Sequence, residues 1–262
     1  MDLPQTPTVT AVKEVEKLKG ASGAHVFLCD DGRERVVKFS DGQKAVVNEH
    51  LGHKLAQALA LPVPGDAFVM VPQSLIDEVP DLVGRHVHPG LHYGTEYDRA
   101  ASDLERIPAP DPRLIQNGAC LPGVLAFNIL LYNTDTGNQN HLLTPTGAGG
   151  YSYTIVDLAG ASGGNWNEQT LQATSSAMNL VGTHPLFVVT VAGIDSFSPY
   201  LEKVEGLGEP DLFAITASIP EAWGVKAEER AAWVQFILKR SRLVRQILLS
   251  NSSAFPSWRR SV

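Results

Sequence analysis

Residues 132–140, YNTDTGNQN, place four amide side chains and one carboxylate directly behind the apolar run VLAFNILL. A turn explains part of this composition, because Asn and Asp hydrogen-bond to their own backbone in turns. The spacing also suits chemistry. Asp135 and Asn140 lie five positions apart in one loop, where a carboxylate could accept a proton from a hydroxyl group and an amide oxygen could bind Mg²⁺.

Phosphoryl transfer from a nucleotide needs more than this loop. It needs a glycine-rich backbone near the phosphates, a lysine held by a helix acid to balance their charge, and a second carboxylate for Mg²⁺. Each part has a candidate in the expected chain order. The candidates are Gly20, Ser22 and Gly23 in a small-residue loop, Lys38 at the end of RVVK, Glu49 in the next segment, Asp135 and Asn140 in the polar loop, and Asp157 at the end of YTIVD.

Each candidate taken alone has an ordinary explanation. A Gly-Ala-Ser-Gly sequence is usually a turn, a lysine at a strand end is usually solvated, and an aspartate often caps the next element. The ordered set on alternating elements favours the chemical reading over these explanations.

The elements that would position these residues follow from periodicity. Segments 25–30 and 34–39 are β-rich and flank Asp31-Gly32, which predicts a hairpin, and 66–72 predicts a further strand. Residues 43–61 show helical spacing of apolar side chains and end at LPVPG. Residues 76–112 show little pattern.

The second half reads as mainly helical. LPGVLAFNILLY (121–132) predicts a buried helix, 141–158 predicts two short strands around a Gly-rich turn, and 227–251 predicts a helical tail. We therefore expect an α+β protein with a β-rich N-terminal lobe, residues 1–95, and a mainly helical C-terminal lobe, residues 96–262.

Composition narrows the class of protein. The net charge of −7 argues against a protein that coats nucleic acid or an anionic membrane, although LKRSRLVRQ (238–246) is a local basic segment. Two cysteines, Cys29 and Cys120, form no disulfide framework and fit a reducing compartment. The sequence shows no secretory signal and no apolar stretch of about 18 residues, so we expect a cytoplasmic protein without a membrane span.

Several segments together resemble the HipA-like kinases, a bacterial branch of the protein-kinase-like fold. The similar segments are GASGAHVFLCDDGRERVVKF (20–39), VVNEHLGHKLAQALALPVP (46–64), NTDTGNQNHLL (133–143), IVDLAG (155–160) and the tail with Trp223. PGLHYGTEY (89–97) resembles the segment that follows the linker between the lobes in that family.

The resemblance implies a bilobal kinase fold that binds ATP and Mg²⁺ and phosphorylates a hydroxyl, on Ser or Thr of a protein or of the chain itself. Lys38 would contact the phosphates, Glu49 would steady it, Asp135 would be the catalytic base, and Asn140 with Asp157 would hold Mg²⁺. Some relatives form toxin–antitoxin pairs with a separate DNA-binding chain, so the resemblance also allows a regulatory partner chain, while this chain itself is expected to bind no nucleic acid.

Two departures from the family leave alternatives open. Thr136-Gly137 stands where relatives usually have Arg-His after the catalytic aspartate, and the metal motif is lengthened to Asp157-Leu158-Ala159-Gly160. A silent nucleotide-binding regulator, an interaction module that docks through 238–246, and a small-molecule or lipid kinase are the alternatives.

Three further features have less specific readings. His86, His88 and His92 could bind a transition metal, but Pro89-Gly90 interrupts any regular face. Neither cysteine has a neighbour that suggests an activated thiolate. Ser22 could carry a regulatory phosphate that opposes a bound nucleotide, although a plain loop serine is the simpler reading.

Overall fold

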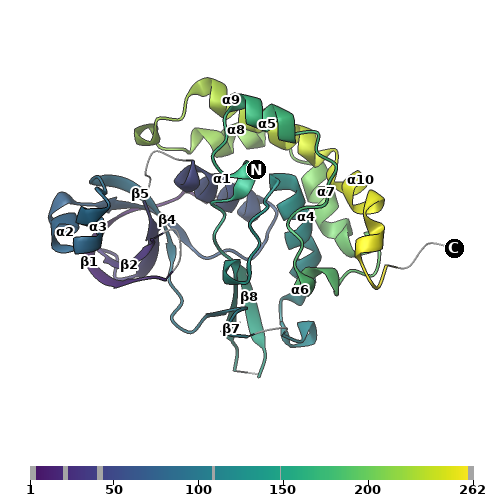
Figure 1. Ribbon diagram of the computed structural model, residues 1–262, viewed down its shortest axis with the longest axis horizontal. Coiled ribbons are helices and arrows are strands. Elements are labelled where there is room, and N and C mark those ends of the chain that lie inside the picture. Colours follow the sequence, from purple (N-terminus) through teal and green to yellow (C-terminus); the bar gives the residue numbers. More distant parts are fainter. Residues whose placement is uncertain (1–3, 20–22, 40–43, 108–109, 148, 259–262) are drawn as a thin grey trace.

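The computed structural model describes residues 4–19, 23–39, 44–107, 110–147 and 149–258. It shows a mixed α+β fold in which a β-barrel lies at one side of a larger, mainly helical part (Figure 1). Within the described residues, no helix is both long and apolar enough to span a membrane.

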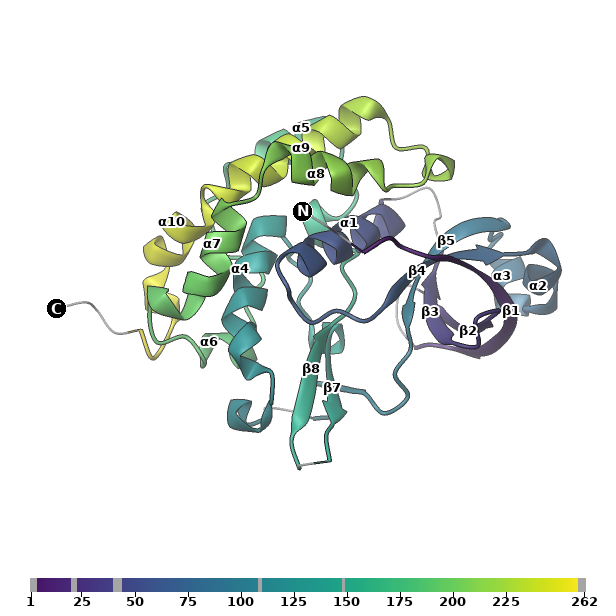
Figure 2. The same cartoon turned by 180° about the vertical axis from the view of Figure 1, so that it is seen from behind.

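The barrel is closed by five strands in the order β1-β2-β3-β5-β4 and is seen almost end-on in Figure 2. The strands are β1 Thr8–Lys17, β2 His25–Cys29, β3 Glu34–Lys38, β4 Asp66–Val71 and β5 Gly90–Glu96. The predicted hairpin is β2 and β3, and Gly32 in its turn has a φ of 79°, a conformation that favours glycine. β1 pairs antiparallel with β2 and parallel with β4, which closes the barrel.

The weakly patterned stretch after β4 contains regular structure. Two short helices, α2 Gln73–Glu78 and α3 Pro80–Gly84, precede β5. The reading of 89–97 as a segment beyond the lobe linker is wrong, because β5 pairs with both β3 and β4 inside the barrel. Short helices of five or six residues span too few turns for an apolar period to stand out.

The rest of the chain is a small sheet with surrounding helices. The sheet order is β6-β7-β8, with β6 Ser102–Asp103, β7 His141–Pro145 and β8 Tyr151–Ile155. The helices are α1 Ala45–Ala58, α4 Leu121–Leu131, α5 Glu168–Thr174, α6 Pro185–Val188, α7 Ser198–Glu205, α8 Glu209–Ala217, α9 Ala227–Ser241 and α10 Val244–Ser250. The predicted helical tail is thus two helices that meet at 242–243.

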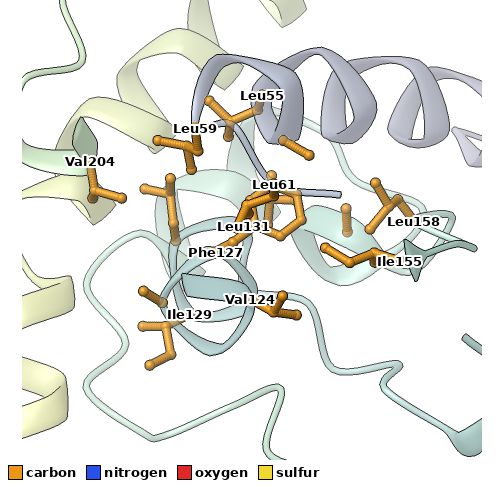
Figure 3. Packing of buried hydrophobic residues seen from close by; sticks show 14 of the residues in the cluster. Leu55, Leu59, Leu61, Val124, Phe127, Ile129, Leu131, Ile155, Leu158 and Val204 are labelled. Carbon is orange, nitrogen blue, oxygen red and sulfur yellow. The ribbon is translucent and has the colours of Figure 1, made fainter. Parts of the chain in front are cut away.

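Two separate clusters of buried apolar side chains hold these parts together. One fills the barrel and the underside of α2 and α3, with Val37 and Val69 among its members. The other, much larger, joins α1 to α4, to the β7–β8 sheet and to the C-terminal helices. Figure 3 shows Leu55 of α1 near Phe127 and Leu131 of α4 in this second cluster. Helix α1 therefore follows a barrel strand in sequence but shares its core with the helical part.

A contact from the C-terminal helices also reaches the barrel. Trp223, between α8 and α9, donates a 2.8 Å hydrogen bond from Nε1 to the backbone oxygen of Leu91 in β5. Its indole packs edge-on against His50, Phe68 and Tyr93. Trp223 thus connects the helical part to α1, β4 and β5.

Candidate active site

Helix α4 leads directly into the polar loop. All eleven of its residues are buried, as the unbroken apolar run predicts. The helix ends at Tyr132, whose φ of 50° is left-handed and turns the chain out of the helix axis. The apolar run before the polar loop therefore anchors the loop's first residue in the core.

A ladder of amides fixes the first part of that loop. Asn133 donates from its backbone to Asn128 O at 2.9 Å and from Nδ2 to Asn128 Oδ1 at 3.2 Å. Asn133 Oδ1 in turn accepts from the backbone N–H of Asp135 at 3.2 Å. Asp135 itself is exposed, so its carboxylate is held at the surface by a buried ladder and is open to a substrate.

The second part of the loop is tied to the segment that carries Asp157. Asn140 is buried and donates from Nδ2 to Asp135 O at 2.9 Å, while its own backbone oxygen accepts from Val156 N at 3.1 Å. Gly160 lies against the other side of the loop, where an added Cβ would come within 2.7 Å of the Asp135 Cβ. The structure thus brings Asp135, Asn140 and the Asp157 turn together.

Lys38 lies between two carboxylates from different parts of the chain. Its Nζ forms an ion pair with Glu49 Oε1 from α1 and another, at 2.6 Å, with Asp157 Oδ1. The second oxygen of Glu49 accepts from the backbone N–H of Leu158 at 3.1 Å. Glu49 therefore holds both the lysine and the turn that presents Asp157, whose own φ is left-handed at 60°.

Burial and charge act against each other at this group. Burial lowers the pKa of Lys38, but Glu49 and Asp157 raise it by more, so the ammonium form is stabilised. Burial also raises the pKa of Glu49, because Lys38 compensates only in part. Burial opposes ionisation of Asp157 as well, yet contact with Lys38 leaves the Asp157 pKa below its ordinary value. Lys38 is therefore held as a cation between the two carboxyl groups.

The predicted phosphate loop lies between β1 and β2. Gly20 and Ser22 fall outside the described residues. Gly23 has a φ of 55°, and its carbonyl accepts a 2.5 Å hydrogen bond from Arg85 Nη1. A Cβ at this position would meet the Arg85 guanidinium at 2.4 Å, which the flexible arginine could relieve by moving, so it is the left-handed backbone conformation that favours glycine here.

The sequence did not single out Asn48, next to Glu49 on α1. Its Nδ2 donates to Ala159 O and Gly164 O, both at 2.7 Å, and its Oδ1 accepts from Trp166 Nε1 at 2.6 Å. These bonds fix the segment that follows Asp157 to α1. An amide in a helix of mixed composition gives no sequence signal of this kind, apart from its position beside the predicted glutamate.

The donors present suit a nucleotide with a divalent cation. Mg²⁺ prefers carboxylate and amide oxygens, and Asp157 with Asn140 offers both. Among the described residues nothing donates to Asn140 Oδ1, since the hydrogen bond of this side chain uses Nδ2. Lys38 supplies the charge that phosphate oxygens require.

The histidines and cysteines that the sequence singles out lie apart from this cluster. The described part of the chain contains no group of three or more His, Cys, Asp or Glu side chains arranged for a metal. His92 is buried in β5 and donates from Nε2 to His88 O at 3.0 Å, whereas His86 is exposed. Burial raises the pKa of both thiols, that of Cys120 to about 12, so neither cysteine is activated.

The basic segment 238–246 is only partly a surface. Arg240 is fully buried, and Arg245 forms an ion pair with Glu205 at 2.7 Å. The two exposed cations, Lys239 and Arg242, leave a weaker patch than the sequence indicates.

Comparison with known proteins places this geometry in context. The HipA-like kinase family matches residues 12–146, which covers more than half of the chain. The crystal structure of CtkA, a proinflammatory kinase of Helicobacter pylori, is similar with a TM-score of 0.63 at 9% identity, covering 96% of this chain and 99% of that one.

A second similar structure is HipA of Shewanella oneidensis MR-1, in a complex with HipB and operator DNA. Its TM-score is 0.44 at 13% identity, covering 88% of this chain and 67% of that one. No curated protein matches in sequence. The likeness to CtkA shows a shared fold.

Proposed function

The chain belongs to the HipA-like kinase family, and from this premise we propose that it transfers the γ-phosphate of ATP to a serine or threonine hydroxyl of a protein, or of itself, with Mg²⁺ as cofactor. The observation that carries the proposal is the position of Lys38 between Glu49 and Asp157, with Asp157 joined to the Asp135 loop through Val156 and Asn140. The proposal includes the two-lobe division at residues 95 and 96, near the end of β5, with helix α1 packed into the helical core across that division.

Each residue has a role that follows from its surroundings. Lys38 binds phosphate oxygens, and Glu49 holds its ammonium group in place from α1. Gly23, and with it Gly20 and Ser22, would let the backbone approach the phosphates. Asn140 and Asp157 would hold Mg²⁺, which neutralises phosphate charge when bound.

Asp135 would orient the acceptor hydroxyl and accept its proton. It is exposed while its backbone is held by buried amides, so it combines access for a protein substrate with a fixed position. Catalysis of this kind depends mainly on positioning and charge neutralisation. Thr136-Gly137 leaves no basic side chain directly after Asp135, so phosphate charge is balanced by Lys38 and the cation.

The same geometry is compatible with a silent nucleotide-binding regulator, and one experiment separates the two. The protein is incubated with Mg·ATP, alone and with a mixture of dephosphorylated proteins, and phosphate incorporation is followed by intact mass and by radiolabel. Nucleotide affinity is measured in parallel by calorimetry. Asp135→Asn and Lys38→Met are the matched variants.

A kinase binds Mg·ATP and incorporates phosphate, Asp135→Asn binds but does not transfer, and Lys38→Met loses both. If the wild type binds Mg·ATP but transfers no phosphate, both alone and with the dephosphorylated proteins, it is the silent regulator. Absence of nucleotide binding by the wild type would overturn the proposal and favour an interaction module.

A further inference from the structure

Arg240, in the last turn of α9, is a cation buried in the helical core. It is 0% exposed. No carboxylate of the described residues forms an ion pair with it, and its partners are backbone carbonyl oxygens. Burying a charged group without an opposite charge costs several kcal/mol, so a specific set of contacts must compensate this arginine.

The first set of contacts is with the end of α4. Nε and Nη2 both donate to Ile129 O, at 3.0 and 2.5 Å, and the guanidinium lies over the Tyr132 ring at 5.2 Å from its centroid. The last carbonyls of a helix carry partial negative charge and lack partners within the helix. Burial lowers the Arg240 pKa to about 10, which still leaves the group charged at neutral pH.

The second set of contacts is with the segment after α5. Nη1 donates to Ala177 O at 2.8 Å, and Thr174 O lies at 3.4 Å. This segment continues to Gly182, whose oxygen accepts from Asn128 Nδ2 at 3.3 Å. A Cβ on Gly182 would meet the Asn128 Cβ at 2.2 Å. Arg240 thus joins two segments that both press on the amide ladder beneath Asp135.

We propose that Arg240 is a positioning residue for Asp135: its guanidinium fixes where α4 stops and how Tyr132 turns the chain, and so sets the start of loop 133–140. The proposal rests on the proposed function in assigning Asp135 to catalysis. The path is short, since Tyr132 precedes Asn133, and Asn133 Oδ1 binds the Asp135 backbone.

Arg230, which is half-buried where Arg240 is fully buried, provides a control with the same kind of contact. Its guanidinium also binds three backbone carbonyls at the end of a helix, those of Thr216, Ile219 and Val225 around the end of α8. Within the described part of the chain, none of its hydrogen-bond partners lies in α4 or in loop 133–140. A loss of stability common to both arginines can therefore be separated from an effect on Asp135.

The test compares wild type with Arg240→Met, Arg240→Lys and Arg230→Met in the full chain. Two quantities are measured: steady-state turnover of Mg·ATP, and hydrogen–deuterium exchange of the amides in 133–140. We expect kcat to fall about 100-fold in Arg240→Met with KM for ATP changed less than threefold, since a displacement of about 1 Å costs about that much. Arg240→Lys should recover part of kcat, and Arg230→Met should stay within twofold of wild type.

Exchange in 133–140 should be at least tenfold faster in Arg240→Met than in Arg230→Met. Equal exchange in these two variants, or unchanged kcat in Arg240→Met, overturns the positioning role. If Arg240→Met fails to fold, Arg240→Lys takes its place, and wild-type kcat and exchange in it overturn the role. Exchange needs no turnover, so a wild type without kinase activity defeats the proposed function while exchange still decides whether Arg240 fixes the loop.

Discussion

Gly160 lies directly against Asp135, so that a single added methyl group would come within 2.7 Å of the Asp135 Cβ. The contact joins the turn after Asp157 to the loop that carries the proposed base. The backbone of Gly160 has a φ of −76°, which any residue adopts, so space alone requires glycine at this position.

Gly160→Ala should therefore move Asp135 without straining the backbone. We expect phosphate transfer to fall by about 100-fold and the free energy of unfolding to fall by about 1–3 kcal/mol from overpacking, while ATP affinity changes little. Transfer kinetics and urea unfolding measure the two effects. Gly193→Ala is the control, because nothing lies within 4 Å of a Cβ there. Wild-type phosphate transfer in Gly160→Ala would contradict the prediction, because it would mean that the loop accommodates the added methyl group without displacing Asp135.

Glu49→Gln should weaken nucleotide binding. It removes the carboxylate that holds Lys38 from α1 and leaves Asp157 as the lysine's carboxylate partner. We expect Kd for Mg·ATP to rise about tenfold, equivalent to about 1.4 kcal/mol, in calorimetric titration. Glu229→Gln breaks the Lys44–Glu229 pair, 2.7 Å long, near the start of the same helix and should leave Kd unchanged. An equal rise in both variants would point to a general loosening of α1.

Asn48→Ala should destabilise the protein through the segment after Asp157. It leaves the Ala159 carbonyl and the Trp166 indole without the partner that Asn48 provides, while Gly164 O keeps a 3.1 Å hydrogen bond from the backbone N–H of Trp166. Each unsatisfied buried group costs about 1–3 kcal/mol, so we expect a loss of about 3 kcal/mol or more in urea unfolding. Asn48→Asp keeps the acceptor for Trp166 but sets a carboxylate against two carbonyl oxygens. Asn48→Asp should lower the free energy of unfolding at least as much as Asn48→Ala. A smaller loss in Asn48→Asp would contradict the assigned hydrogen bonds.

The protein should lose stability in mild acid. Burial lowers the pKa of His50 and His141 to about 3 and that of His53 to about 4, from an ordinary value of 6.5. Between pH 6.5 and 4 the unfolded chain binds protons that the folded chain does not. The free energy of unfolding should therefore fall by about 1.4 kcal/mol per pH unit for each histidine as pH decreases through this range.

Urea unfolding at a series of pH values between 7.5 and 4.5 measures this slope. His53→Gln should reduce the slope by about 1.4 kcal/mol per pH unit. A slope unaffected by His53→Gln would mean that this histidine is already charged in the folded protein.

Much of the fold follows from local sequence patterns. The Asp31-Gly32 hairpin, the helix through Glu49 and the buried helix 121–131 all appear where periodicity and turn residues predict them. Strand β1 gives no clear sequence pattern, because it carries register shifts at 11–13 and 14–16 as it curves between two partners. Such bulges break the alternation of apolar and polar side chains by which a strand is recognised.

The candidate site also has parts that the sequence reveals and parts that only the structure reveals. Lys38, Glu49, Asp135, Asn140 and Asp157 are residue types that do chemistry, and their order along the chain made them visible. Asn48 and Arg240 act mainly through backbone carbonyls of distant segments. Asn48 binds the carbonyls of Ala159 and Gly164, and Arg240 binds those of Ile129 and Ala177. No local pattern encodes which carbonyl a buried amide or guanidinium will meet, so these contacts become visible only in three dimensions.

The membership of α1 in the helical core has a consequence for how the site comes apart. Glu49, Asn48 and the Asp157 turn all belong to one packed body, whereas Lys38 and Gly23 belong to the barrel with its own interior. If the barrel unfolds first, the proposed base and metal ligands stay in place, while Lys38 and Gly23, the proposed phosphate-binding residues, are lost from the site. A nucleotide that contacts both parts would then stabilise the barrel and raise its melting temperature towards that of the helices.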